Sequence, residues 1–471
     1  MGDAHPPLNN EETLPVPPVA MNEAGRTYGR LRSAVSTTFA RSRLRQVGYS
    51  LADQALAVGG GFLVNVVLAR TQTKEEYGMF VLSYSVFAFL LGLYHAAILE
   101  PYTIYGAGRY RDRFSEYLRL IARSSAILCL LLSGVLLVAF LVFSRISPQL
   151  TSRALVGLSL TAGVLFTGHL LRRAFYLQHQ PALAAKCSLA SFLTVAGLLW
   201  LTFRFHLLNS FSVFVILALG WIVAGASFGR KLRFGSPPRS FLEIEPNYWR
   251  EHWNYAKWVF ATALVFQFTT QGYFWLVGGI LSLKEVGNLK AMYLLVQPVD
   301  QIFIALSYLV IPAMAARYAA KRTRDLLSLW KRYVLATIGV TGLFAVSVRI
   351  CGKPVMHALY AGRYDGLAPY LFVLALLPLL MGIGNTMNNA LIASEKPKLL
   401  FLAYVCSAAT TFLGGIPLVL RFGMWGAIYG MLLSATSYTG VLALAFVLRF
   451  HHRIATPTNS GSERDLGVRT A

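Results

Sequence analysis

Long apolar runs recur along almost the whole chain, and they constrain its fold more than any other feature. They begin near residue 47 and end near residue 449. Each is about 20 residues long, which is the length at which a helix crosses the hydrocarbon core of a bilayer. Open strands are excluded because lipid satisfies no backbone hydrogen bonds, and the runs do not alternate as barrel strands do. The sequence therefore predicts an all-α polytopic membrane protein with about twelve transmembrane helices, at 47–70, 77–99, 118–144, 154–177, 183–203, 209–229, 256–280, 287–311, 333–350, 368–392, 399–420 and 424–448.

The formal charge of +23 is spread over short segments between these runs. If both termini are cytoplasmic, only 11 of the 43 Lys and Arg residues fall on the outside: Arg70, Lys74, Arg145, Arg153, Arg204, Lys284, Lys290, Arg349, Lys353, Arg363 and Arg421. Such a bias sets the orientation of membrane proteins. This bias accounts for the positive charge without nucleic-acid binding. We therefore predict a protein of the bacterial cytoplasmic (inner) membrane with both ends inside. The arginines of residues 26–46 are expected to bind anionic membrane lipid.

Two matches between the halves of the chain indicate an internal duplication. Glu76 and Gly78 recur as Glu285 and Gly287, at the start of the second run of each half. A second match follows the fourth run of each half and pairs Ala174 with Ala390 and Pro181 with Pro397. Transporters built from parallel repeats bind substrate between the repeats. The predicted division is a disordered N-terminus plus basic interfacial segment (1–46), two six-helix bundles (47–229 and 256–448), a cytoplasmic linker (230–255) and a cytoplasmic tail (449–471).

Polar side chains inside apolar runs are costly in lipid, and they mark either a pathway or a contact between helices. Several runs place them at i, i+3 and i+4, on one helix face. The candidates for a cavity or for ion coupling are Asp53, Gln271, Gln297, Asp300, Gln301, Asn385 and Asn389. Asp300 lies near the membrane middle beside Pro298, which frees a backbone carbonyl, so a moving ion- or proton-binding element is predicted there. The alternatives are interhelical hydrogen bonds alone and, for Asp53, an interfacial position.

Basic residues near the predicted cytoplasmic face are candidates for binding an anionic head group, because guanidinium forks match phosphate oxygens. They are Arg109, Arg172, Arg173 and Lys257. The alternative for Arg172 and Arg173 is that they only anchor a helix end. No Walker motif, zinc-ligand spacing or catalytic triad is present, so we predict no enzymatic activity, no cofactor and no bound metal.

The end of the first run carries a family resemblance. Leu68-Ala69-Arg70 followed by Glu75-Glu76-Tyr77-Gly78 resembles the stretch A-R-x-L-x-x-x-E-Y-G of Wzx-type polysaccharide and O-antigen flippases, with Gln72 in place of the leucine. These flippases belong to the multidrug/oligosaccharidyl-lipid/polysaccharide (MOP) superfamily. The resemblance implies export of an undecaprenyl-pyrophosphate-linked oligosaccharide, a precursor of cell-surface polysaccharide, by ion-coupled alternating access. It also implies a polysaccharide polymerase and glycosyltransferases as partners.

Two other functions remain compatible with the sequence. One is a multidrug or cation antiporter of the same superfamily, in which Asp53 and Asp300 would bind cations. The other is a membrane component of a glycan-synthesis complex that transports nothing. The duplication favours a transporter, and the few acids and many bases near the inside face favour anionic cargo.

Overall fold

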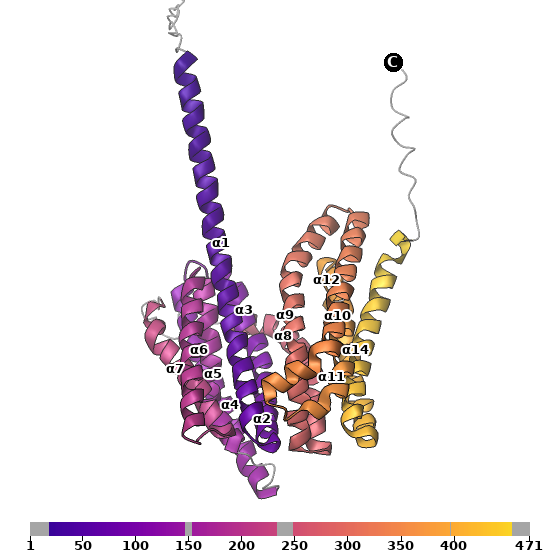
Figure 1. Cartoon of the computed structure of the whole chain (residues 1–471). Coiled ribbons are helices and arrows are strands. Elements are labelled where there is room, and N and C mark those ends of the chain that lie inside the picture. The colour runs from indigo at the N-terminus through magenta and orange to yellow at the C-terminus, as the bar shows by residue number, and fades with distance from the viewer. Residues whose placement is uncertain (1–17, 147–152, 233–247, 396, 455–471) are drawn as a thin grey trace, which may run out of the picture.

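Helices make up almost all of the computed structural model, which describes residues 18–146, 153–232, 248–395 and 397–454. No β-strand occurs within those ranges. The N-terminal bundle (indigo to magenta in Figure 1) contains α1 (Pro18–Thr71), α2 (Lys74–Tyr94), the π-helix η1 (His95–Leu99), α3 (Glu100–Ala107), α4 (Phe114–Ile146), α5 (Arg153–Leu177), α6 (Pro181–Arg204), α7 (Ser210–Phe228) and the 3-10 turn η2 (Gly229–Lys231). The C-terminal bundle (salmon to yellow) contains α8 (Tyr248–Ile280), α9 (Leu283–Ala319), α10 (Thr323–Tyr360), the 3-10 turn η3 (Asp365–Leu367), α11 (Ala368–Leu374), α12 (Leu377–Ala393), α13 (Pro397–Leu413) and α14 (Gly415–Ile454). The predicted all-α polytopic membrane fold is confirmed.

Ten of the described helical stretches are long and apolar enough to cross a membrane. The two predicted spans outside this set are α8, whose polar side chains lower its hydropathy, and α13, which is short. Residues 415–422, the first part of α14, continue the path of α13. The helical backbone breaks only at Gly423, where φ is 58° and ψ is −129°. Only glycine adopts this conformation without strain. Gly423 thus separates the last two predicted spans, and all twelve are helical over most of their length.

Several boundaries differ from those expected. α1 is one continuous helix from Pro18, so the basic segment and the first span form a single rod, which Figure 1 shows rising beyond the other helices. Residues 1–17 and 455–471, predicted as parts of the flexible ends, lie outside the described residues.

The segment predicted as a linker, 230–255, also ends differently. α8 begins at Tyr248, inside that segment, and residues 233–247 lie outside the described ones. The early start has a packing cause: the Tyr248 ring lies 5.9 Å from that of Tyr117, and His252 Nε2 lies 3.1 Å from the carbonyl oxygen of Ala97. The first turns of α8 are therefore packed on the N-terminal bundle, and its second half contacts α2 of that bundle as well as α13 and α14.

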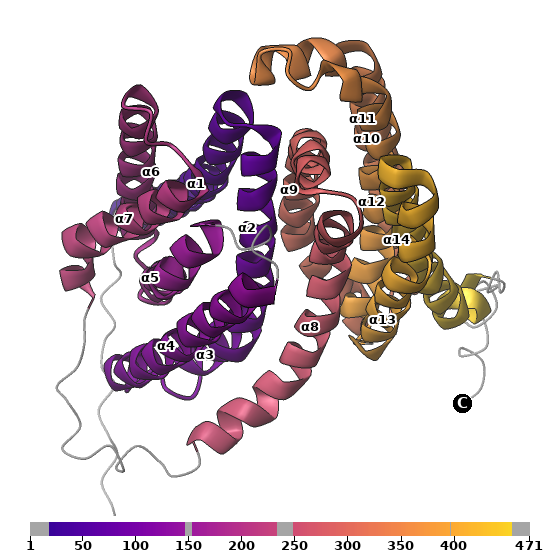
Figure 2. The same ribbon diagram turned by 90° about the horizontal axis from the view of Figure 1, so that it is seen from below.

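α5 lies in the middle of the N-terminal bundle, with α2, α4, α6 and α7 around it (Figure 2). Aromatic side chains fix α2 against it: the Phe166 ring stacks on Phe87 at 5.3 Å and on Tyr94 at 5.0 Å. Such pairs add about 0.5–1.5 kcal/mol each beyond the burial of their surface. This packing holds the polar C-terminal half of α5 at a fixed height within the bundle.

The two bundles meet where α2 crosses α9, and the duplicated motif makes the contact. A Cβ on Gly78 would lie 1.7 Å from the carbonyl oxygen of Leu283, and one on Gly287 would lie 2.7 Å from that of Lys74. Both positions are buried, and each requires the absence of a side chain. The glycines identified as a repeat thus allow the backbones of the two repeats to approach closely.

Further contacts join the bundles at the same end. Arg363 Nη1 donates to the carbonyl oxygens of Arg70 at 3.0 Å and of Ala69 at 3.5 Å, and Arg70 Nη1 donates to that of Ala358 at 3.3 Å. Toward the opposite end, where both described termini lie, the ribbons of the two bundles diverge (Figure 1).

Candidate functional site

Asp53 of α1 is fully buried, and three side chains saturate its carboxylate. Arg172 of α5 forms a two-point ion pair with it, Nε to Oδ1 at 3.2 Å and Nη2 to Oδ2 at 2.7 Å. The hydroxyls of Tyr176 and Ser188 donate to it at 2.7 and 2.5 Å. A buried carboxylate persists only when paired and hydrogen-bonded in this way. The sequence analysis gave Asp53 to ion coupling and Arg172 to head-group binding, and the structure joins them to each other.

Arg173 lies on another side of α5. Successive helical residues are 100° apart, so Arg172 reaches Asp53 on α1, whereas Arg173 shares a face of α5 with His169, four residues before it. The imidazole rings of His169 and of His95 on η1 lie in an edge-to-face contact, with centroids 5.4 Å apart. The charges of Arg172 and Arg173 both act on these two rings. Within the described part of the chain, Arg173 has no hydrogen-bond or ion-pair partner, and its side chain is half-buried.

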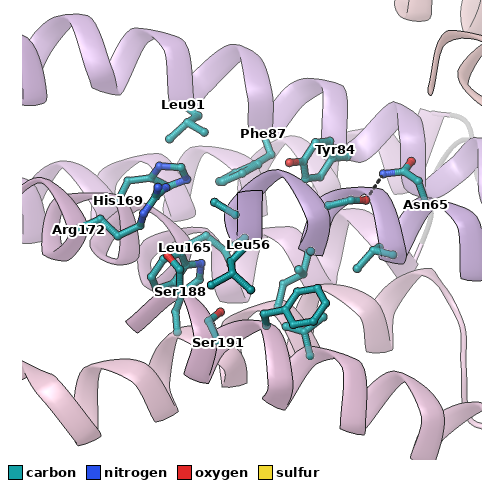
Figure 3. Close-up of a pocket in the computed structure, with 18 of the residues that line it drawn as sticks. Leu56, Asn65, Tyr84, Phe87, Leu91, Leu165, His169, Arg172, Ser188 and Ser191 are labelled. Carbon is teal, nitrogen blue, oxygen red and sulfur yellow. Dashed lines mark hydrogen bonds between the residues drawn. The ribbon is translucent and has the colours of Figure 1, made fainter. Parts of the chain in front are cut away.

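A cavity of about 160 Å³ occupies the interior of the N-terminal bundle. Figure 3 shows His169 and Arg172 side by side at one end, Asn65 at the other, and Phe87 and Leu91 of α2 between them. Helices α1, α2, α5, α6 and α7 all contribute to its wall. The cavity is thus polar and basic at one end and apolar along most of its length.

The C-terminal bundle has a neutral polar cluster where the N-terminal bundle has the ion pair between Asp53 and Arg172. Asn389 is buried, and its Nδ2 lies 2.8 Å from Ser307 Oγ and 3.3 Å from the Tyr333 hydroxyl. Asn385 contacts the same two groups at 3.1 and 3.5 Å. These amides link α9, α10 and α12, which is the alternative role that the sequence left open for them.

The first half of α9 carries a charged stripe that the sequence analysis identified only in part. Lys290 is half-buried, and its Nζ lies 5.7 Å from the ring centroid of Phe274 and 5.6 Å from that of Tyr293. Asp300 is half-buried as well and lies two turns after Tyr293 on the same helix. Neither charge forms an ion pair with a described residue. The sequence analysis counted Lys290 among the outside residues, at the start of the predicted span 287–311, but α9 begins at Leu283, so Lys290 lies about two turns inside the helix.

The glutamines predicted for the cavity are placed separately. Gln297 is half-buried and Gln301 is exposed on α9. Gln271 of α8 donates only to Thr270, at 3.5 Å, and the neighbouring Gln267 reaches the Ala88 carbonyl of α2 at 3.3 Å. Gln267, which was not one of the predicted cavity residues, thus joins the two bundles.

Arg109 and Lys257 lie at the end where the bundles diverge, apart from the buried cluster. Arg109 forms an ion pair with Glu251 of α8 at 2.8 Å, and both side chains are substantially exposed. Lys257 is exposed and donates to Asn254 at 3.3 Å. The four predicted head-group cations therefore do not form one site.

Other partners in the site were missed by sequence reasoning. Tyr176 and Ser188 have no distinguishing pattern, because one hydroxyl in an apolar helix resembles any other. His95 carried a signal: it lies at i+11 from Tyr84, on the stripe that continues through Phe87 and Leu91.

No protein-family model matches the chain, and no curated protein matches its sequence. Solved structures do match. The chain is similar to the inward-facing conformation of a multidrug resistance MATE family transporter of the MOP superfamily, with a TM-score of 0.71 and 12% identity over 88% of this chain and 96% of that one. It is similar to the lipid II flippase MurJ in an inward closed conformation, with a TM-score of 0.67 and 14% identity over 85% and 87% of the two chains.

An outward-facing MATE family transporter gives a TM-score of 0.59, with 11% identity over 87% of this chain and 96% of that one. The chain therefore has the two-bundle fold seen in these transporters.

Proposed function

We propose that the chain is a flippase that moves an undecaprenyl-pyrophosphate-linked oligosaccharide from the inner to the outer leaflet of the bacterial cytoplasmic membrane. It would act by alternating access, with both termini inside, and would supply a polysaccharide polymerase with units built by glycosyltransferases. The MOP fold supports transport, and the motif at Arg70 and Glu75 to Gly78 supports this branch of the superfamily.

The surroundings of Asp53 are the observation that favours an anionic cargo over a cationic one. A cation antiporter needs a carboxylate that is open to its cargo, but Asp53 is fully buried and held by Arg172, Tyr176 and Ser188. Arg173 and Lys290, in contrast, have no acidic partner among the described residues. Unpaired cations at membrane depth are costly. An anionic head group would supply the missing counter-charge.

The bundle arrangement supports the transport cycle. The contact at α2 and α9 closes the outer side, and the divergence at the other end gives access from the cytoplasm. Rocking of one bundle against the other would reverse this, as in other duplicated transporters. Coupling to an ion gradient would involve Asp300, the remaining carboxylate of the α9 stripe.

Deletion of the gene, with complementation by the full chain, tests the proposal. The deletion strain is expected to accumulate lipid-linked oligosaccharide in the cytoplasmic leaflet and to lose surface polysaccharide. Unchanged lipid-linked pools together with raised sensitivity to cationic drugs would reject the flippase and favour the antiporter. Unchanged pools and drug sensitivity, with surface polysaccharide still lost, would favour the non-transporting component.

A further inference from the structure

His95 of η1 and His169 of α5 pack edge-to-face, and Arg173 follows His169 by four residues, on the same face of α5. None of the three is fully buried. No acidic side chain among the described residues forms an ion pair with any of them. Asp53 does not serve, because Arg172 already occupies its oxygens.

Two local features build the cluster. The π-helix η1 interrupts α2 at His95, and single π-turns inside α-helices are frequent at functional sites. The Tyr94 hydroxyl lies 2.6 Å from Ser125 Oγ on α4, which fixes one side of this turn. Trp221 of α7 packs over Gly168 of α5, where a Cβ would lie 2.3 Å from the indole ring. The neighbouring His169 is therefore held against the rings of both His95 and Trp221.

Arg172 and Arg173 have different surroundings although they are adjacent. Asp53 holds Arg172 in place and neutralises it, whereas Arg173 keeps its donors and its charge. A topology anchor at the end of α5 needs only a positive charge facing water. It would not need two imidazoles packed beside it within the bundle.

We propose that His95, His169 and Arg173 form a binding site for a phosphate group of the anionic lipid carrier. The proposal rests on the flippase function and names the subsite that holds the head group. The guanidinium offers two parallel donors that match two phosphate oxygens, and each neutral imidazole offers one N–H. Arg172, fixed by Asp53, acts as a positioning residue that keeps α5 in register with α1.

Binding of geranylgeranyl pyrophosphate to the purified full-length protein tests this site, with geranylgeraniol as the probe that has the same tail and no phosphate. Arg173→Gln is expected to weaken binding of the pyrophosphate about tenfold or more, since it removes charged hydrogen bonds. Binding of geranylgeraniol should not change. Arg230→Gln, which removes an exposed charge from η2, is the matched control and should bind like the wild type.

His95→Phe is the second variant, because it keeps a ring against His169 and removes the nitrogen donors. It should weaken binding several-fold even if Arg173→Gln does not fold. Wild-type affinity in every folded variant, or an equal loss in Arg230→Gln, would overturn the site. The flippase proposal is judged separately by lipid-linked pools in cells. If the pools are unchanged on deletion but Arg173→Gln still loses the pyrophosphate, the flippase proposal fails and the binding site stands.

Discussion

The ion pair between Asp53 and Arg172 is expected to stabilise the N-terminal bundle far more than a surface pair would. Removing one partner of a buried pair costs about 3–5 kcal/mol, because the other charge stays buried and unpaired. Arg172→Gln should therefore lower the free energy of unfolding by about that amount. The double variant Asp53→Asn/Arg172→Gln should recover part of it.

Chemical unfolding in detergent micelles measures both effects. Arg113→Gln is the control, since Arg113 pairs with Glu116 on the surface with its side chain 58% exposed, and such pairs contribute about 0–1 kcal/mol. Equal losses of unfolding free energy in Arg172→Gln and Arg113→Gln would show that the buried pair stabilises the protein no more than the surface pair does.

Lys290 provides a second test at the residue scale. Its charge lies against the Phe274 and Tyr293 rings without an acid, so an anionic cargo passing α9 would interact with it. Lys290→Gln is expected to lower the export of lipid-linked cargo about tenfold, the equivalent of one charged hydrogen bond. Lys290→Arg should retain most of it. Lys284→Gln, which changes an exposed lysine at the start of the same helix, should export normally. A normal rate in Lys290→Gln would show that the cargo does not use this cation.

At this scale the sequence predicted residue types better than partners. Asp53 and Arg172 were both identified, because charges in apolar runs are rare, but they were given separate roles. Their pairing depends on how α1 and α5 are brought together, 119 residues apart, and no local pattern encodes that. Lys290 was counted with the outside residues because it lies near the start of the apolar run, whereas α9 begins earlier, at Leu283.

Among the elements, the crossing of α2 and α9 depends on two glycines. Gly78→Val and Gly287→Val would each place a side chain inside the backbone of the other helix. We expect either variant to hold the outer ends of the bundles apart and to abolish transport while leaving each bundle folded. Spin labels at Glu75 and Lys284 measure the separation, which should increase.

Gly279→Val is the matched control, because a Cβ at Gly279 meets nothing within 4 Å. It should leave the label separation and transport unchanged. An unchanged separation in Gly78→Val would show that the crossing is not the outer contact. The sequence predicted these glycines as a repeated motif but did not predict that the two copies touch. A sequence repeat shows that two positions are equivalent, but it does not show where the symmetry axis that relates them lies.

For the whole molecule, the twelve apolar runs and the even number per half were readable from the sequence, because lipid leaves helices as the main solution. The relative position of the bundles was not. It depends on a few contacts, such as that from the Arg363 guanidinium to the Arg70 carbonyl, which lie 293 residues apart. α8 shows the same limit: its aromatic start packs on the N-terminal bundle, and its second half lies between α2 of that bundle and α13 and α14 of its own.

The reciprocal arginine contact should set the balance between the two states of the molecule. Arg363 donates to the carbonyls that end α1, and Arg70 donates to the Ala358 carbonyl near the end of α10. Each cation thus meets the negative end of a helix in the other bundle, where unpaired carbonyls are exposed. If each contact contributes about 1 kcal/mol, losing both should shift the equilibrium toward the outward-open state by roughly 30-fold. Arg70→Ala/Arg363→Ala should then show a larger outward-open population by spin-label distances, while Arg349→Ala, whose guanidinium lies over the Phe372 ring in one bundle, should not. Equal populations in the two variants would mean that the glycine crossing alone closes the outer side.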